Sequence, residues 1–227
     1  MAKKNKTKTN WKYYTIELAV VFIGVTAGFL LNNWRQDNVE LKLEEKYLTS
    51  FYNDVITDEK NLDSLMLRSK IKIDTLLNVI RDTEVKNVPL SEELAQVIVN
   101  QILYIEWFAP SNDTYEDIKN SGNLNLISDY ELKENISSYY KYLIEVKNVE
   151  QFYKNHMDNY TLPILYKNYH LFKRKFVNRK AYQTLEFTNM YLGVIALLQQ
   201  NTKTYNEAFE KNQELKEKLK IVLDLSQ

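Results

Sequence analysis

Residues 13–31 read YYTIELAVVFIGVTAGFLL, and the interpretation of the whole chain starts from this stretch. Its only charged residue is Glu17. Nineteen helical residues at about 1.5 Å per residue cover about 29 Å, which matches the hydrocarbon thickness of a bilayer. Trp11 and Trp34 flank the stretch, where amphipathic rings favour the lipid headgroups. The sequence therefore predicts a transmembrane helix over residues 13–31, with Trp11 and Trp34 as interfacial anchors.

The charges on either side of this stretch predict its orientation. The lysines before it are Lys3, Lys4, Lys6, Lys8 and Lys12, with no acid among them. Residues 35–45 carry both signs. Because Lys and Arg are retained on the cytoplasmic side, we expect a basic cytoplasmic tail over residues 1–12 and a periplasmic body over residues 32–227, in a bacterial inner membrane. A cleaved signal peptide is the competing interpretation, but the apolar run is long for one and no A-x-A site follows it.

The composition argues against several classes of function. The chain has no cysteine, which excludes disulfides, thiolate zinc sites, iron–sulfur clusters and a cysteine nucleophile. Lys+Arg and Asp+Glu both number 30, so no net charge favours nucleic acid. Walker, dinucleotide-binding, H-E-x-x-H and G-x-S-x-G motifs are missing from the sequence. We therefore predict no catalytic site, no metal, no cofactor and no nucleic-acid partner.

The body is predicted to be all-α. Four Gly and three Pro in 227 residues leave few helix breakers, and apolar residues recur at spacings of three and four. The first body helix is expected from near Val39 to about Asp82. Whether the membrane helix continues into it stays open, although no Gly or Pro lies between Leu31 and Val39. Its apolar stripe consists of Leu41, Leu48, Phe51, Val55, Leu62, Leu65, Ile73, Leu76 and Ile80.

Capping signals divide the middle of the body. Residues 83–90 read as a connector, after which Ser91 is expected to cap a second helix that ends at Pro110. Residues 112–121 should form a short helix closed by Gly122 in the left-handed conformation.

Two long helices are expected to complete the body. Ser128 and Glu131 have the spacing of a capping box, and Pro163 should kink or end the helix that follows. A final helix is predicted over residues 185–225. Long helices with short connectors indicate an elongated antiparallel helical bundle that follows the transmembrane helix.

Two blocks of sequence resemble an uncharacterised family of Bacteroidota single-span inner-membrane proteins. The first block is Glu17, Phe22-Ile23-Gly24 and Asn32-Asn33-Trp34. The second is Thr114-Tyr115-Glu116-Asp117-Ile118, Ser121-Gly122-Asn123-Leu124 and Leu126-Ile127. The chain departs from the family pattern in Val25-Thr26-Ala27-Gly28 and in Ile118, where Leu is usual. The resemblance implies a one-span helical membrane protein and carries no described activity.

Gly24 and Gly28 form a G-x-x-x-G pair that favours close packing of two membrane helices, so we predict a homo-oligomer through this helix. Glu17 falls on the same face. One interpretation makes it an intramembrane carboxylate that exchanges a proton at a helix interface or a channel. The other places it about 6 Å inside Tyr13, where it reaches the headgroups or pairs with Lys12.

The body offers weaker candidates. His156 shares a stripe with Tyr153 and Tyr160, where a hydrogen-bonded core histidine competes with a ligand-binding cleft. His170 is expected at the surface. Residues 166–180 interleave aromatic and basic side chains, which fits either a solvated loop or a surface for an acidic partner or a lipid headgroup.

Three functions follow from these features. The leading hypothesis is a membrane-anchored helical scaffold of the bacterial envelope that binds another envelope protein and has no catalytic activity. The first alternative is an ion-coupled or pore-forming membrane oligomer that uses Glu17. The second alternative is a periplasmic ligand-binding helical domain.

Overall fold

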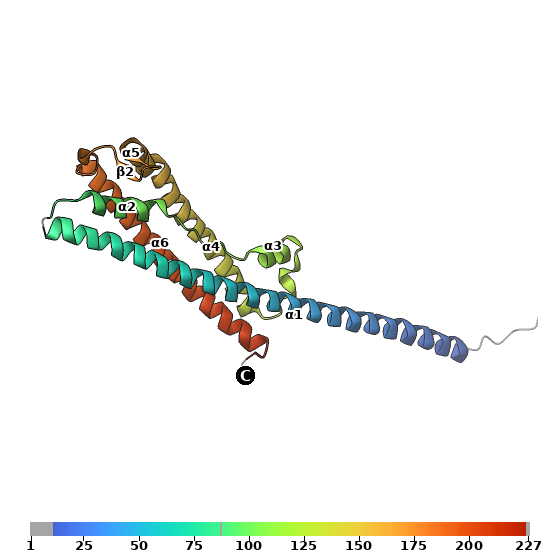
Figure 1. Ribbon diagram of the computed structural model, residues 1–227. Coiled ribbons are helices and arrows are strands. Elements are labelled where there is room, and N and C mark those ends of the chain that lie inside the picture. Colours follow the sequence, from blue (N-terminus) through green and yellow to red (C-terminus); the bar gives the residue numbers. More distant parts are fainter. Residues whose placement is uncertain (1–10, 87, 226–227) are drawn as a thin grey trace, which may run out of the picture. The chain divides into compact units, whose positions relative to one another are not determined.

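The computed structural model describes residues 11–86 and 88–225, and this part of the chain is mostly helical (Figure 1). The chain divides into two units at the boundary between Lys46 and Tyr47. We refer to the second unit, from Tyr47 onward, as the body. Helix α1 runs from Trp11 to Ile80 as one element, so the helices expected over residues 13–31 and from Val39 onward are continuous in hydrogen bonding.

The body is a helical bundle built on three long helices, and α6 runs antiparallel to the other two. They are the part of α1 after residue 46, α4 (Tyr130–His156) and α6 (Leu185–Val222). On α4 and α6, Glu131 pairs with Lys218 at 2.7 Å, and the Tyr205 hydroxyl donates to Glu150 at 2.7 Å. The residue numbers therefore rise on one helix as they fall on the other. The predicted packing of long helices against one another is confirmed for the body.

Most buried positions of the three helices recur at alternating spacings of three and four, the heptad pattern of coiled-coil packing. On α1 they are Leu48, Phe51, Val55, Asp58, Leu62, Leu65, Ser69, Lys72, Leu76 and Val79. On α6 they are Phe187, Tyr191, Val194, Leu198, Asn201, Tyr205, Ala208, Asn212, Leu215 and Leu219. On α4 they include Leu132, Ile136, Tyr139, Leu143, Val146 and Tyr153. Polar side chains thus occupy several core positions, which the apolar stripes predicted from sequence left out.

Shorter elements connect these helices. They are π-helical turn η1 (Arg81–Val85), α2 (Glu92–Leu103), α3 (Asp113–Asn120), 3₁₀ turn η2 (Asn123–Leu126), π-helical turn η3 (Met157–Thr161), α5 (Leu162–Asn168), strands β1 (Tyr169–His170) and β2 (Lys175–Phe176), and 3₁₀ turn η4 (Arg179–Ala181). The strands form a short antiparallel hairpin with Tyr169 opposite Phe176. This hairpin departs from the predicted all-α class. It forms because two buried aromatic side chains pack edge to face, with ring centroids 4.9 Å apart.

Several predicted helix ends are confirmed. The Ser91 hydroxyl accepts a hydrogen bond from the Leu94 amide at 3.3 Å, as an N-cap should. Gly122 has φ of +74°, the left-handed conformation that glycine adopts without strain. Pro163 lies in the first turn of α5, directly after the π-helical turn η3, so the chain bends where a proline interrupts the hydrogen-bond ladder.

Two predicted boundaries are wrong. The N-cap of α4 is Asp129, whose carboxylate accepts from the Leu132 amide at 3.0 Å, and not Ser128. Helix α2 ends at Leu103, well before Pro110. Residues 104–111 are not helical and pass along α1 instead, from Lys72 to Asp58. We call residues 104–111 the crossing segment.

Candidate functional site

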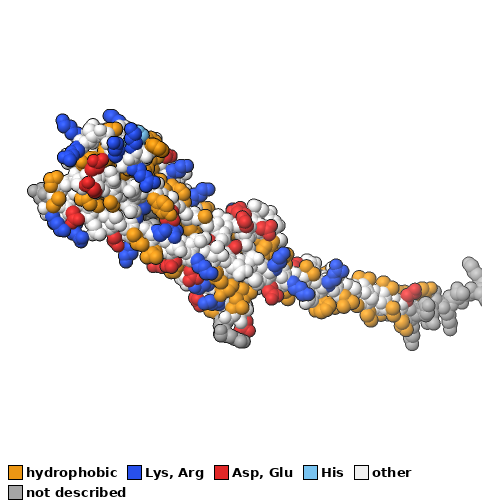
Figure 2. Space-filling view, viewed as in Figure 1, with side chains coloured by type: hydrophobic (Ala, Val, Ile, Leu, Met, Phe, Trp, Pro, Cys, Tyr) orange, Lys and Arg blue, Asp and Glu red, His pale blue; other side chains and the backbone are white. Residues whose placement is uncertain are grey.

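The apolar segment of α1 presents hydrophobic side chains on every side. All residues from Tyr14 to Asn32 are exposed, and the large hydrophobic side chains among Tyr14 to Leu31 are between 58% and 70% exposed. Figure 2 shows hydrophobic side chains along the visible face of this part of α1. A helix that is apolar all round lies in lipid or inside a larger core. By length and composition, α1 is the one helix of the described residues that is able to cross a membrane.

The predicted site residues of this segment lie on α1 with open surroundings. A Cβ built on Gly24 or Gly28 meets no atom within 4 Å, so this face is free for a neighbouring helix. Trp11 is 77% and Trp34 67% exposed, and Glu17 is exposed as well. The lysines before Trp11, on which the orientation depends, lie outside the described residues, as does the side chain of Lys12.

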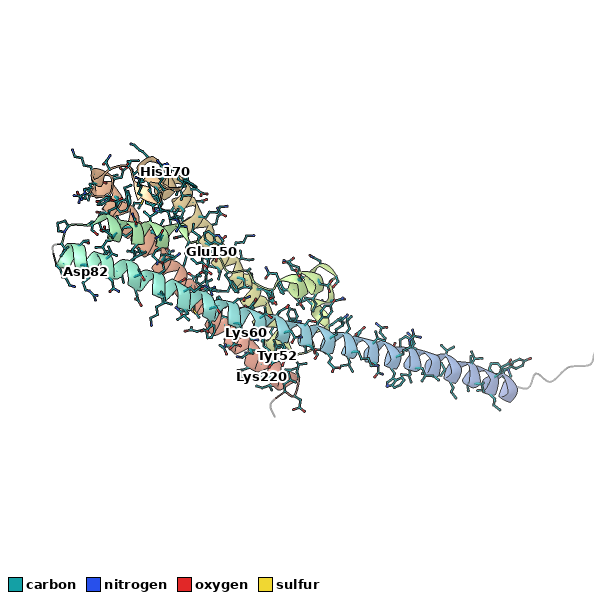
Figure 3. The ribbon with its side chains drawn as sticks, viewed as in Figure 1. Tyr52, Lys60, Asp82, Glu150, His170 and Lys220 are labelled. Carbon is teal, nitrogen blue, oxygen red and sulfur yellow. The ribbon has the colours of Figure 1, made fainter. Side chains whose placement is uncertain are left out.

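The crossing segment is held by polar side chains of the bundle that are buried or partly buried. The Lys72 ammonium on α1 donates to the carbonyl oxygen of Tyr104. A Glu150 oxygen on α4 accepts from the Phe108 amide at 2.7 Å (Figure 3). Non-helical backbone inside a protein needs such partners, because its amides and carbonyls are otherwise unpaired. These polar side chains therefore provide hydrogen-bond partners for the backbone of the crossing segment. The positions of Gly and Pro alone did not predict this non-helical segment.

Asp58 holds the end of the crossing segment in the same way. It is fully buried, and its oxygens accept from the Ser111 amide and the Tyr139 hydroxyl, each at 2.8 Å. The Asn212 amide of α6 donates to the Tyr139 hydroxyl at 3.1 Å, which links all three long helices. Burial raises the pKa of the Asp58 carboxyl, although its hydrogen bonds with Ser111 and Tyr139 act in the opposite direction.

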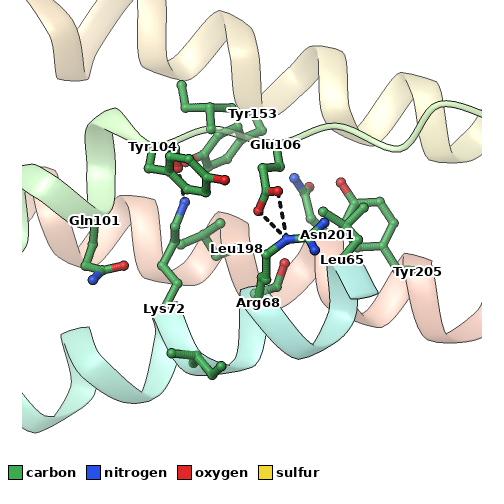
Figure 4. Close-up of a pocket in the computed structure, with 13 residues that line it drawn as sticks. Leu65, Arg68, Lys72, Gln101, Tyr104, Glu106, Tyr153, Leu198, Asn201 and Tyr205 are labelled. Carbon is green, nitrogen blue, oxygen red and sulfur yellow. Dashed lines mark hydrogen bonds and ion pairs between the residues drawn. The ribbon is translucent and has the colours of Figure 1, made fainter. Parts of the chain in front are cut away.

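A cavity of about 190 Å³, partly open to solvent, is lined by the crossing segment and by α1, α2, α4 and α6 (Figure 4). All of its lining residues belong to the body. Leu65, Ile105 and Leu198 contribute apolar wall. Its polar groups include those of Arg68 and Lys72 on α1, Gln101 on α2, Glu106 on the crossing segment, Tyr153 on α4 and Asn201 on α6.

The two cations of the cavity have different surroundings. The Arg68 Nε lies 2.7 Å from Oε1 of Glu106, in an ion pair whose Arg68 side chain is 47% exposed. Lys72 is 8% exposed and, within residues 11–86 and 88–225, forms no ion pair within 4.0 Å. Burial lowers the pKa of Lys72, and the charge of Glu106 partly offsets that effect. Figure 4 shows Lys72 directed from α1 toward Tyr104 and Tyr153.

Tyr153 is the second notable group of the cavity. Its side chain is 1% exposed, and its hydroxyl has no hydrogen-bond partner in the described part of the chain. Burial raises the pKa of Tyr153 to about 12, so the hydroxyl is a proton donor at neutral pH. The ring of Trp107 packs edge-on against it, with centroids 5.7 Å apart.

The cleft predicted around Tyr153, His156 and Tyr160 does not form as a unit. Only Tyr153 lines the cavity. The His156 ring lies 5.3 Å from that of Tyr160, whose side chain is 65% exposed. His170 lies at the exposed hairpin, as predicted (Figure 3). The residues described in the structure contain no group of three or more His, Asp or Glu side chains that could hold a metal ion.

The basic stretch over residues 166–180 forms α5, the hairpin and the start of η4. Figure 2 shows Lys and Arg side chains gathered over this end of the body. Phe172, between the two strands, is 92% exposed. The basic side chains of the stretch are exposed, as both interpretations require, whereas Tyr169 and Phe176 are buried.

Sequence reasoning missed Lys72, Arg68, Glu106 and Asn201 as cavity residues. A signal for two of them was present, because Lys72 and Asn201 stand at heptad positions where apolar residues are the rule. Arg68 and Glu106 carry no such signal, since their pairing depends on the path of the crossing segment.

Comparison of the chain with protein-family models, with curated proteins and with solved structures finds no match. Function is therefore inferred from the residues and their geometry.

Proposed function

We propose that this protein is a membrane-anchored helical scaffold of the bacterial envelope that binds another envelope protein and has no catalytic activity. The apolar segment of α1 spans the inner membrane with the N-terminus in the cytoplasm, and the body stands in the periplasm. The observation that carries the proposal is the exposure of hydrophobic side chains all round residues 14–31. Such a surface is unfavourable in water and favourable in lipid.

The G-x-x-x-G pair supports self-association of the span. Small residues four apart let two helix backbones approach closely, and Gly24 and Gly28 have open space in front of them. Glu17 serves as an interfacial residue in this proposal. The scaffold therefore predicts that Glu17→Gln leaves assembly and phenotype unchanged. Loss of function with normal expression and assembly would instead support the ion-coupled oligomer.

Topology can be tested in the native background because the chain has no cysteine. Single-cysteine variants Thr9→Cys and Ser138→Cys place one thiol before the span and one on the exposed face of α4. In cells with a permeabilised outer membrane, an impermeant maleimide should label Ser138→Cys and leave Thr9→Cys unlabelled. The reverse pattern would contradict the orientation. Full-length protein found free in the soluble fraction would contradict the membrane anchor.

Partner binding can be tested by crosslinking from the body in intact cells. Phe152 is 60% exposed on α4 and offers a position for a photoreactive amino acid. A scaffold predicts a discrete adduct with a second envelope protein, whereas the same group at Phe22 should give adducts with lipid or with another copy of the chain. Finding only self-adducts from body positions would argue against a scaffold that binds another protein.

A further inference from the structure

The cavity beneath the crossing segment contains hydrogen-bond donors without matching acceptors. The Tyr153 hydroxyl is buried and unpartnered in the described part of the chain, and its high pKa keeps the proton on the oxygen. The Lys72 ammonium has three N–H groups, of which the Tyr104 carbonyl takes one. Buried donors of this kind usually have a partner, in the protein or in a bound molecule.

The charge of the cavity wall favours an anion. Its charged residues are Lys72, Arg68 and Glu106, which sum to one positive charge. Glu106 is already paired with Arg68 at 2.7 Å, so the remaining charge belongs to Lys72. Glu150, the acid of α4 nearest to Tyr153 in sequence, does not line the cavity, and it accepts from the Phe108 amide and the Tyr205 hydroxyl, each at 2.7 Å.

The size and the apolar wall of the cavity favour an organic anion over an inorganic one. A dry cavity of about 150 Å³ lined by Leu, Ile and Phe binds benzene, and the volume here is about 190 Å³. Leu65, Ile105 and Leu198 offer apolar contact to such a ring or to a short branched chain. An inorganic anion would leave this wall without a partner.

The geometry points to a binding site for a small monocarboxylate with one ring or a short aliphatic chain. Its carboxylate lies between the Lys72 ammonium and the Tyr153 hydroxyl, and its apolar part lies against Leu65, Ile105 and Leu198. This site is a function additional to the scaffold proposed above and rests on the body alone. Disproving the membrane anchor would leave the binding site intact. Disproving the binding site would likewise leave the membrane anchor intact.

The experiment has to distinguish anion binding by Lys72 from a purely structural role. In that case the ammonium only holds the Tyr104 carbonyl, and the cavity has no preference for anions. The full-length chain in detergent micelles can be titrated with benzoate, benzylamine and benzyl alcohol. These probes share one ring and differ in the charge of the attached group. Saturation-transfer NMR reports the bound probe, and Trp107 fluorescence reports the ring that packs on Tyr153.

We expect benzoate to bind with a dissociation constant of about 1 mM or tighter, in the range for a ligand of this size. Benzylamine should bind at least about tenfold more weakly, because its ammonium faces Lys72. Lys72→Met should weaken benzoate about tenfold to a hundredfold through loss of a charged hydrogen bond, and Tyr153→Phe about threefold to tenfold. Lys70→Met removes the same charge from an exposed position of α1 and should leave binding unchanged.

Three results would overturn the site. One is the absence of benzoate binding to the folded protein at about 10 mM, well above the expected dissociation constant. Another is equal affinity for benzoate and benzylamine. The third is an equal loss in Lys70→Met and Lys72→Met. Circular dichroism checks that each variant is folded, and Tyr153→Phe keeps the test valid if Lys72→Met does not fold, since it removes a single hydroxyl.

Discussion

Two regions of α1 differ in how much of their apolar surface is buried. Residues 14–31 are exposed on every side and are apolar on every side. After residue 46 the same helix buries one stripe at spacings of three and four, while most positions between are exposed or partly exposed. A stripe means water on one side and protein on the other, whereas an all-round apolar surface calls for a single apolar environment. Burial along α1 therefore distinguishes a segment that packs one stripe against the body from an apolar segment whose side chains are all exposed.

The same two regions treat polar residues differently. In the body, Asp58 and Lys72 stand at core positions and each has a hydrogen-bond partner on the crossing segment. In the apolar segment, Glu17 is exposed. A buried polar group in the body therefore fixes a neighbouring backbone, while a carboxylate near the end of a span can reach the headgroups. This contrast locates the buried polar contacts in the body, where they fix the path of the crossing segment.

The largest effect should come from deleting core volume in the body. Leu62 is fully buried, and Leu62→Ala should lower the free energy of unfolding by about 2–5 kcal/mol. Leu30→Ala makes the same chemical change at a position that is 62% exposed and should leave the unfolding of the body unchanged. Urea titration in detergent micelles, followed by near-UV circular dichroism, measures both. If Leu30→Ala destabilised the body as much as Leu62→Ala does, the two regions would share one core.

A charge placed in the apolar segment should act on insertion and not on the body. Phe22→Arg puts a cation near the centre of the span, at a cost of about 2.5–3.5 kcal/mol for insertion. We expect a marked shift of the protein from the membrane to the soluble fraction. Phe152→Arg makes the same change on the exposed surface of α4 and should leave localisation unchanged. Cell fractionation with alkaline carbonate extraction checks both variants, and retention of Phe22→Arg in the membrane would argue against the assigned span.

Two acids one position apart on α1 should give opposite pH dependences of stability. Burial raises the pKa of the Asp58 carboxyl, so its contribution to stability is present below the ordinary value of 3.8 and is lost as the pH rises through the raised folded value. Asp58→Asn removes this pH-dependent loss. The free energy of unfolding of the variant should therefore rise relative to that of the wild type as the pH rises from about 4 to 7.

Glu59 provides the matched control. Burial acts to raise the pKa of Glu59, but the hydrogen bonds with Lys216 and Gln213 and the charge of Lys216 outweigh it and lower the pKa. Its contribution is present above the ordinary value of 4.5 and is lost as the pH falls through the lowered folded value. The free energy of unfolding of Glu59→Gln should therefore fall relative to that of the wild type as the pH rises. Urea unfolding at a series of pH values gives both differences, and slopes of equal sign would contradict the assignment.

The helices of this protein could be predicted from sequence because their signals are local. Apolar spacing predicted the long helices, while Ser91 marked the start of α2 and Gly122 followed the end of α3. The end of α2 could not be found this way, because Leu103 is followed by residues whose backbone is satisfied by side chains from other helices. Sequence could not decide whether Ser128 or Asp129 caps α4, because both residue types accept hydrogen bonds from the first turn of a helix. Only the backbone geometry distinguishes them.

The cavity was beyond sequence reasoning for a related reason. The lining brings Lys72 and Tyr153 together from helices far apart in the chain, and no spacing encodes that meeting. The heptad positions did contain a usable signal, because a lysine or an aspartate on a buried stripe has to find a partner. Following Lys72 and Asp58 as stripe positions would have indicated that a polar backbone segment packs against this stripe of α1.

The smallest effect should come from a glycine in the body, compared with one in the span. Gly193 lies inside α6, where glycine costs about 0.5–1 kcal/mol relative to alanine. A Cβ at this position would lie 3.4 Å from Nε2 of His156, an ordinary van der Waals distance, so Gly193→Ala should raise the free energy of unfolding by about that amount. Gly24→Ala should leave the unfolding of the body unchanged, because a Cβ there meets no atom within 4 Å. Urea titration decides between them, and a loss of stability in Gly193→Ala would mean that His156 is held too tightly to accept one methyl group.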